Sequence, residues 1–259
     1  MMLSNRVRAV WADRADAVEE QSKTMTNSLS DNLTRVQDRI AAAAARAGRD
    51  RSTITLVAVS KTHPVEELLA AYDLGVRHFG ENRVEEASVK LPAFKLTIGD
   101  PAVVFHMIGH IQSRKAEDVA TLFDRVHSVD SVKLAQHLTR FAKRPLPILL
   151  EVNVSGEESK YGFDGARRAE LFEAIEVISQ LPNLQLDGLM TMAPLVENPE
   201  EARPVFRALR ELRAEIAAHY PALTLPHLSM GMTDDFEVAI EEGATLVRVG
   251  RAIFGERSP

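Results

Sequence analysis

Residues 55–80 read TLVAVSKTHPVEELLAAYDLGVRHFG, and this stretch decides the fold. The apolar run at 55–60 has the length of a buried strand, and residues 65–74 carry apolar side chains at helical spacing up to Gly75, a common helix terminator. A second apolar run follows at 76–80. A strand, a helix and a strand in succession are typical of a parallel sheet whose strands are joined by covering helices.

The same alternation continues along the rest of the sequence. It predicts eight strands, at 55–60, 76–80, 103–108, 125–129, 147–154, 184–190, 225–229 and 245–249. It predicts the following helices at 65–74, 83–94, 113–122, 131–142, 165–181, 199–219 and 234–242, with a short helix or turn after the last strand. Eight such units predict an α/β fold with a single closed (β/α)8 TIM barrel. An open doubly wound sheet is the alternative, and the lack of a dinucleotide-type glycine fingerprint after the first strand disfavours it.

An extra helix is predicted ahead of the barrel. Apolar residues recur at helical spacing at Leu29, Leu33, Val36, Ile40, Ala43 and Ala47. Gly48 ends this pattern. We expect residues 25–259 to form one domain and residues 1–24 to be an N-terminal extension, for which disorder is one interpretation. The extension is either a genuine tail or a segment ahead of a start at Met25.

The composition argues against several classes of function. Hydrophobic residues make up 45% of the 259 residues and charged residues 26%, as in an ordinary globular domain. The formal net charge of −6 does not suggest a nucleic-acid or anionic-membrane surface, and no apolar run approaches the roughly 18 residues that span a membrane. Without cysteine there are no disulfides, thiolate metal sites or cysteine nucleophiles, which fits a cytoplasmic protein.

Lys61 is the first candidate functional residue, because it directly follows the buried run 55–60. Active sites of such barrels lie at the carboxyl ends of the strands. Burial lowers the pKa of a lysine and favours the neutral amine that forms an imine with a carbonyl. The alternative is a lysine whose stem lies along the barrel and whose ammonium reaches water.

The ends of the seventh and eighth strands form a candidate phosphate site. Barrels commonly bind phosphate there through loop backbone N–H groups. Ser229 and Gly231 supply a hydroxyl and a close backbone approach, and Gly250 and Arg251 close the eighth strand similarly. The alternative is a pair of ordinary strand-to-helix turns. A strand-end lysine facing a phosphate site is the arrangement that pyridoxal phosphate requires, so we expect a covalent Schiff base on Lys61.

Arg248 lies within the apolar eighth strand, between Val247 and Val249. A buried guanidinium without partners is costly, so we expect a dedicated partner. One hypothesis is a barrel glutamate. The other is the pyridine nitrogen of the cofactor, which a permanently protonated arginine would keep unprotonated, weakening the ring as an electron sink.

These motifs together resemble a known family, the pyridoxal phosphate homeostasis proteins, also called the YggS/PROSC family. The resemblance covers about residues 29–255. Its segments are LVAVSKT at 56–62, FGENR at 79–83, HMIGHIQS at 106–113, VNVSGEESKYG at 152–162, GLMTM at 188–192, LSMGMTDD at 228–235 and VRVGRAIFG at 247–255.

The resemblance implies a fold like the barrel domain of alanine racemase without its second, all-β domain. It implies that Lys61 carries the Schiff base, that Arg248 faces the pyridine nitrogen and that Asn82 lies near the ring. It implies a phosphate held by Ser229, Gly231 and Gly250. Relatives carry serine or threonine at positions 233 and 251; Thr233 fits, whereas Arg251 departs, and its cation either adds to phosphate binding or points outward.

Two classes of function follow. The family is linked to keeping free pyridoxal phosphate at safe levels, so we expect an intracellular binder and carrier with no strong turnover and no catalytic residue. Its partners would be pyridoxal phosphate and apo forms of enzymes that use it, with neither nucleic acid nor membrane, and we expect a monomer. The alternative is a racemase-like enzyme of fold type III. Racemisation needs bases on both faces of the substrate, and Tyr161 is the one tyrosine expected in a site loop.

The histidines favour structural roles over a metal site. His106 and His110 are four residues apart but are expected on a strand end and its loop, with no evident third ligand, so no metal is expected. His227 is expected inside the barrel. The polar segment 155–160 predicts a mobile loop over the site, with Lys160 on a solvated face or visiting the cofactor.

Overall fold

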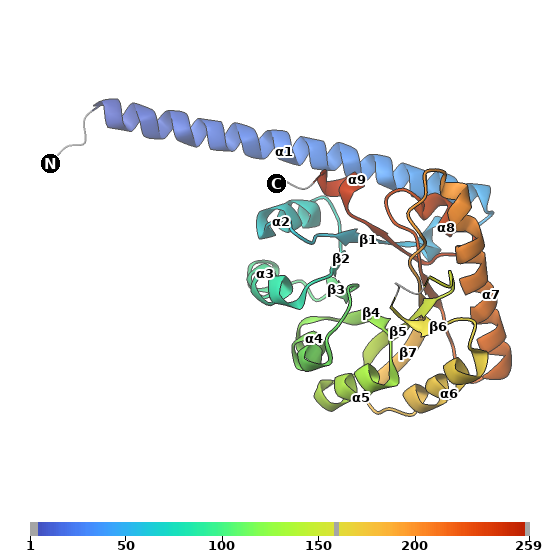
Figure 1. The fold of residues 1–259 in the computed structure, drawn as a ribbon. Coiled ribbons are helices and arrows are strands. Elements are labelled where there is room, and N and C mark those ends of the chain that lie inside the picture. The colour runs from blue at the N-terminus through green and yellow to red at the C-terminus, as the bar shows by residue number, and fades with distance from the viewer. Residues whose placement is uncertain (1–4, 158–160, 257–259) are drawn as a thin grey trace.

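The computed structural model describes residues 5–157 and 161–256. Its main sheet closes into a barrel, because strands β1 to β5 and β7 to β9 pair in chain order, β9 pairs with β1, and every pairing is parallel. Figure 1 shows the strands enclosed by helices. The strands are β1 (Thr55–Val59), β2 (His78–Glu81), β3 (Val104–Met107), β4 (Arg125–Val129), β5 (Leu146–Asn153), β6 (Phe163–Asp164), β7 (Leu184–Met190), β8 (His227–Ser229) and β9 (Leu246–Val249). The predicted barrel is therefore confirmed.

The α-helices between the strands form the outer layer. They are α1 (Asn5–Arg46), α2 (Val65–Asp73), α3 (Val84–Ile98), α4 (Ala116–Leu122), α5 (Val132–Phe141), α6 (Arg168–Ser179), α7 (Arg203–His219), α8 (Phe236–Glu241) and α9 (Arg251–Phe254). Short 3-10 turns stand at Arg51–Thr53, Ser113–Lys115 and Pro199–Ala202. In the described part of the chain, no helix combines the length and apolarity that crossing a membrane requires.

Most element boundaries agree with the sequence, and the differences have local causes. β4 and β7 have the predicted bounds. β2 begins two residues late because the Val76 N–H still bonds the carbonyl of Ala71 at the end of α2. β8 also begins late, after Pro226, which has no N–H to donate to a ladder.

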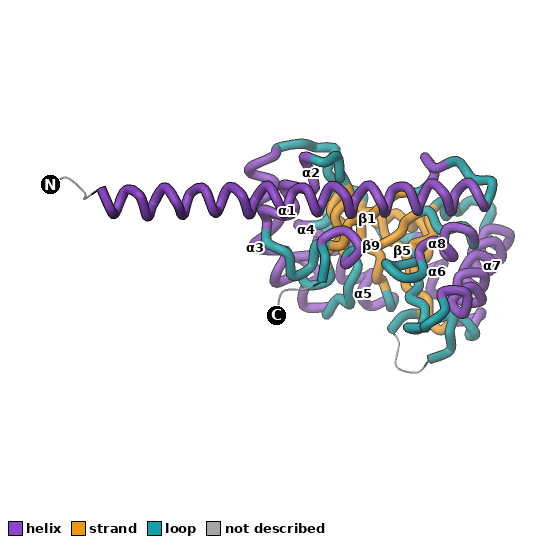
Figure 2. The backbone as a smooth tube through the Cα atoms, turned by 90° about the horizontal axis from the view of Figure 1, so that it is seen from above, coloured by secondary structure: helices purple, strands orange, loops and turns teal. Residues whose placement is uncertain are grey.

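Helix α1 lies along the outside of the barrel, over α8 and α9, and its N-terminal half projects beyond the barrel (Figures 1 and 2). Leu29, Leu33, Val36 and Ile40 are buried against it, which confirms the predicted apolar stripe. Asn32 Nδ2 donates to the carbonyl of Ile253 at 2.9 Å. The helix thus packs against α9, which follows β9. It continues back to Asn5, and the boundary at residue 24 stays a prediction.

A short strand, β6, was not expected. It pairs with β5 through Phe163 opposite Val152 and Asp164 opposite Asn153. Two residues carry no periodic signal, so this pairing depends on tertiary contact. It pairs the backbone that follows the polar segment with β5. Lys160 lies outside the described residues, so the prediction that it visits a cofactor stays a prediction.

The barrel interior is unusually polar for this architecture, in which branched aliphatic side chains normally dominate. A small apolar cluster of Val57, Leu149, Met190 and Leu246 occupies part of it. Polar side chains fill much of the rest, among them the buried residues His106, His127, Ser229 and Arg248. The interior is therefore built around hydrogen bonds as well as apolar contacts.

Candidate functional site

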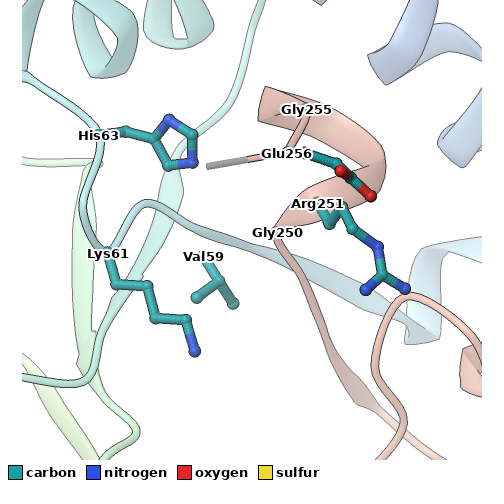
Figure 3. A pocket seen from close by; sticks show the side chains of 7 residues that line it. All are labelled: Val59, Lys61, His63, Gly250, Arg251, Gly255 and Glu256. Atoms are coloured by element: carbon teal, nitrogen blue, oxygen red, sulfur yellow. The ribbon is translucent and has the colours of Figure 1, made fainter. Parts of the chain in front are cut away.

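The candidate site lies at the carboxyl ends of β1 and β9. Lys61 follows β1, and its side chain lines a cavity of about 460 Å³ together with Val59, His63, Gly250, Arg251, Gly255 and Glu256. Figure 3 shows the Lys61 and Val59 side chains beside the end of β9, with Arg251 at the start of α9. Strand register explains this arrangement: Ala58 pairs with Val249, so the residues that follow β1 and β9 emerge side by side.

A buried ion pair supports the backbone just before Lys61. Lys90 Nζ lies 2.9 Å from Glu81 Oε1 and 2.8 Å from the carbonyl oxygen of Ser60. The Ser60 hydroxyl donates to the same Glu81 oxygen at 2.6 Å. Burial raises the pKa of Glu81, and the Lys90 ammonium opposes that shift. The pair was not identified from sequence, although Glu81 directly follows the predicted strand 76–80.

The backbone just after Lys61 is held too. The Thr62 N–H donates to Glu86 Oε1 at 2.5 Å, and Lys90 Nζ reaches that oxygen at 2.7 Å. Thr62 has φ of +66°, a left-handed conformation that a β-branched residue rarely adopts without such support. His63 is fixed by Glu67 at 2.8 Å and stacks on Phe254 of α9. Lys61 therefore extends from a rigid loop.

The opposite wall of the cavity is formed by the end of β9. A Cβ atom on Gly250 would lie 3.1 Å from the Val59 carbonyl oxygen and 3.3 Å from Val59 Cβ, so glycine allows the two strand ends to approach closely. Arg251 lines the cavity, but one of its guanidinium nitrogens lies 2.7 Å from each carboxylate oxygen of Asp234. The cation is thus paired across the loop that follows β8.

Asn82 follows β2 and has an incomplete set of hydrogen bonds. Its Oδ1 atom is buried and has no hydrogen-bond partner among the described residues. Such an orphaned acceptor is uncommon in folded proteins and indicates a missing donor such as a ligand or water. The Asn82 backbone is fixed by Gly109, whose Cβ, if present, would lie 2.2 Å from the Asn82 carbonyl oxygen.

Arg248 is buried in β9, with 4% of its surface exposed. Its Nη1 atom donates to Ser229 Oγ at 2.6 Å and its Nη2 atom to the Thr191 carbonyl at 3.0 Å. No carboxylate is hydrogen-bonded to it in the described ranges, but the negative charges of Asp235 and Glu151 act on it and raise its pKa, so a barrel glutamate as its partner stays a hypothesis. Burial lowers the pKa of Arg248 to about 10, which still leaves it protonated at neutral pH.

Gly231 is needed for packing on α8. It has φ of +91°, and a Cβ atom there would lie 2.6 Å from Ala239 Cβ and 2.8 Å from Phe236 Cα. Its backbone also continues the sheet, because the Arg248 N–H donates to the Gly231 carbonyl at 3.0 Å. Its glycine character therefore has a structural cause that does not involve a ligand.

The structure brings some of the predicted residues together around the cavity and places others elsewhere. Lys61 and Gly250 share the cavity wall. Ser229 and Arg248 are joined by a hydrogen bond in the barrel interior. Asn82 and Gly231 lie at the ends of other strands, and neither is among the cavity-lining residues. Binding roles for all six stay predictions.

Glu151 was missed in the sequence, although it stands out as a charge within the apolar run 147–154. It is 4% exposed in β5. Burial, and after it the charge of Asp130, raises the pKa of Glu151 to about 7, while Arg248 opposes the shift. It is therefore a second titratable group close to Arg248.

His110 lies on the loop after β3, as expected. Its Nδ1 atom is 3.1 Å from Asp130 Oδ2, and its ring stacks on Tyr161 with centroids 3.9 Å apart. His106 instead lies inside the barrel and contacts His78 and His127. Within residues 5–157 and 161–256, no group of three or more histidine, aspartate and glutamate side chains could hold a metal ion.

Comparisons with known proteins place this geometry in context. The family model for the alanine racemase N-terminal domain matches residues 32–258. The chain is 44% identical over 230 residues to a pyridoxal phosphate homeostasis protein of Aquifex aeolicus, covering 88% of this chain and 97% of the relative. It is 40% identical over 235 residues to one of Escherichia coli, covering 89% and 97%.

Solved structures show the same likeness. PipY of Synechococcus elongatus, solved with pyridoxal phosphate bound, is 37% identical with a TM-score of 0.75, covering 88% of this chain and 100% of that one. An alanine racemase of Clostridium difficile is 15% identical with a TM-score of 0.69, covering 89% of this chain and 57% of that one, and shows the fold alone.

Proposed function

The chain belongs to the family of pyridoxal phosphate homeostasis proteins, and from this membership we propose that it holds pyridoxal 5'-phosphate as a Schiff base on Lys61 and acts in intracellular pyridoxal phosphate homeostasis. The observation that carries the proposal is the position of Lys61. It extends from a rigid loop into a cavity whose opposite wall is the end of β9. A strand-end lysine facing that wall suits covalent binding of a phosphorylated aldehyde.

The residues present fit this cofactor. The cavity volume of about 460 Å³ lies in the range of small-molecule sites. The buried, orphaned Oδ1 atom of Asn82 would accept a hydrogen bond, and Gly250 leaves backbone accessible where a side chain would collide with Val59. When bound, the cofactor supplies an aldehyde that condenses with an amine. Lys61 would provide that amine.

We assign the phosphate to the ends of β8 and β9, with Gly250, Gly231 and Ser229 as the candidate residues. Gly250 is best placed, because it lines the cavity. Ser229 lies deeper, with its hydroxyl between Arg248 and His127, so its contribution would pass through Arg248. Arg251 would contribute its positive charge only in part, because it is paired with Asp234.

Arg248 supports a carrier rather than an enzyme. Its pKa of about 10 keeps it a donor at neutral pH, so it would hydrogen-bond the pyridine nitrogen without accepting a proton from it. A ring whose nitrogen stays unprotonated withdraws electrons weakly. We therefore expect α-proton exchange of amino acids in deuterated water, followed by NMR, to be no faster than with free pyridoxal phosphate. Rapid exchange would favour the racemase-like alternative.

Replacing Lys61 tests the binding role. Lys61→Ala should lose the visible absorbance of the bound cofactor, since Lys61 is the one lysine among the described residues that line the cavity. Lys133→Ala, which changes an exposed lysine on α5, is the matched control and should keep the band. Weak non-covalent binding through the phosphate is expected to survive in Lys61→Ala. A full band in folded Lys61→Ala would contradict the proposal.

The cellular setting follows from the same proposal. We place the protein in the cytoplasm as a monomer that passes the cofactor to apo forms of dependent enzymes. The lack of cysteine is compatible with a reducing compartment. The loaded protein should restore the activity of an apo-enzyme that binds pyridoxal phosphate. It should do so faster than an equal concentration of free pyridoxal phosphate when a scavenger amine is present to trap released cofactor. Sedimentation velocity measures the oligomeric state.

A further inference from the structure

A continuous chain of hydrogen bonds crosses the barrel interior from β2 to β9. His78 Nδ1 lies 3.0 Å from His106 Nε2, and His106 Nδ1 lies 2.8 Å from His127 Nε2. His127 Nδ1 lies 2.8 Å from Ser229 Oγ, which Arg248 Nη1 contacts at 2.6 Å. His106, His127 and Ser229 are at most 1% exposed, so the central members of the chain depend on one another for their hydrogen bonds.

The direction of this chain follows from its Arg248 end. An arginine only donates, so Ser229 Oγ accepts from Arg248. In the described structure the other partner of the Ser229 hydroxyl is His127 Nδ1, and that nitrogen therefore accepts the hydroxyl proton. His127 must then carry its proton on Nε2 and donate to His106 Nδ1. His106 in turn donates from Nε2 to His78 Nδ1.

All three imidazoles are neutral in this arrangement. A positive charge on His127 would require donation from Nδ1 and would leave the buried Ser229 hydroxyl proton without its acceptor. Burial, and then the neighbouring His78, holds the pKa of His106 well below its usual range. Burial, then His106 and Arg248, does the same for His127. Arg125 and His227 also face both rings and add positive charge against their protonation.

The chain of hydrogen bonds orients a lone pair of the Ser229 oxygen toward the buried guanidinium of Arg248. The donor-to-acceptor series begins at Arg248 and the Ser229 oxygen and ends on His78, and each hydrogen bond in it polarises the next. No carboxylate is hydrogen-bonded to that guanidinium in the parts of the chain described here. We propose that His127, backed by His106 and His78, is a positioning residue that fixes Ser229 as an acceptor and thereby sets the orientation of Arg248.

The consequence for the cofactor rests on the proposed function, in which Arg248 faces the pyridine nitrogen. The assignment of protons to the three histidines does not rest on it, because it follows from contacts within the protein. The positioning role of His127 can therefore be tested on the protein without cofactor as well as on the loaded form.

The first test is nitrogen NMR on the full chain labelled with ¹⁵N-histidine, without cofactor. His78, His106 and His127 should each show a protonated Nε2 and an unprotonated Nδ1, and His106 and His127 should stay neutral at pH 6. A protonated Nδ1 on neutral His127, or an imidazolium at His127 or His106, would overturn the proposal.

The second test compares His127→Phe with His127→Asn. Phenylalanine removes the acceptor, whereas the asparagine Oδ1 atom stands near the former Nδ1 position and restores it. The Arg248 side-chain N–H resonances should shift and broaden in His127→Phe and return toward those of the parent in His127→Asn. His137→Asn, on α5 outside the barrel, is the matched control and should leave them unchanged. Unchanged Arg248 resonances in His127→Phe would overturn the proposal. If His127→Phe does not fold, His127→Asn is compared with Ser229→Ala instead. Equally disturbed Arg248 resonances in those two variants would then overturn the proposal.

Cofactor binding separates this proposal from the proposed function. His127→Phe should weaken pyridoxal phosphate binding by about tenfold, the value of one lost hydrogen bond near a charged group, with recovery in His127→Asn. A parent protein that binds no pyridoxal phosphate would contradict the proposed function, and the NMR tests would still decide the positioning role. Normal binding by His127→Phe despite disturbed Arg248 resonances would overturn the link to the cofactor.

Discussion

The ammonium of Lys90 lies 2.8 Å from the carbonyl oxygen of Ser60, so a side chain on α3 holds the residue that precedes Lys61. The same ammonium contacts Glu81 and Glu86, and Glu86 binds the N–H of Thr62. The Lys61 backbone is thus clamped on both sides. Because one partner of a buried ion pair cannot be removed without stranding the other, this clamp gives a prediction.

Lys90→Met should lower the free energy of unfolding by about 3 kcal/mol, because it leaves the buried Glu81 carboxylate without its cation. The loop should also loosen, so formation of the covalent cofactor adduct on Lys61 should slow. Urea denaturation and stopped-flow absorbance measure the two effects. Lys133→Met changes an exposed lysine and should affect neither the free energy of unfolding nor the rate of adduct formation. Equal losses of stability and rate in the two variants would show that the clamp contributes nothing.

Glu151 should make stability depend on pH. Burial raises the pKa of its carboxyl from an ordinary value of 4.5 to about 7, so the folded protein favours the neutral form. Its stabilising contribution is therefore complete below about pH 4.5 and is lost as the pH rises through 7. A shift of this size corresponds to about 3 kcal/mol.

Glu151→Gln should remove that dependence, since glutamine stays neutral at every pH. The difference in unfolding free energy between variant and parent should grow in favour of the variant from pH 5 to pH 8. Urea denaturation at several pH values measures it, and taking the difference cancels the other titrating groups. A difference that does not change across this range would mean that Glu151 does not titrate there.

Gly250→Ala should weaken cofactor binding while the barrel stays folded. The φ of −115° suits alanine, but its Cβ would press on the Val59 carbonyl oxygen and move the end of β9 away from Lys61. We expect about tenfold weaker binding for a stability loss of about 1 kcal/mol. Gly75→Ala, strained by a φ of +94° but remote from the cavity, should lose similar stability and keep its affinity. Equal affinities for both variants would place the cofactor elsewhere.

The sequence was sufficient for the barrel because each of its eight strands is a distinct apolar run and the helices between them show helical spacing. It also identified Lys61 and Gly250, which the register of β1 and β9 brings to one cavity. The partner of Arg248 could not be predicted, because a buried guanidinium is satisfied as well by a hydroxyl and a carbonyl as by a carboxylate. Nothing local to Arg248 distinguishes these outcomes.

The histidine chain was missed for a related reason. His78, His106 and His127 each fall within a predicted strand, and that was the available signal. Whether they meet depends on how neighbouring strands are offset around the barrel, which the sequence does not specify. His106 was instead considered with His110, four residues away, although His106 lies within β3, His110 lies in the loop after it, and the two have different partners.

The most direct test of the account is to locate the covalent adduct. The protein would be saturated with pyridoxal phosphate, reduced with borohydride to make the linkage permanent, digested and mapped by mass spectrometry. We expect one stoichiometric modification, on the peptide that contains Lys61. A stoichiometric modification on Lys90 or another lysine, with the Lys61 peptide unmodified, would contradict the central claim.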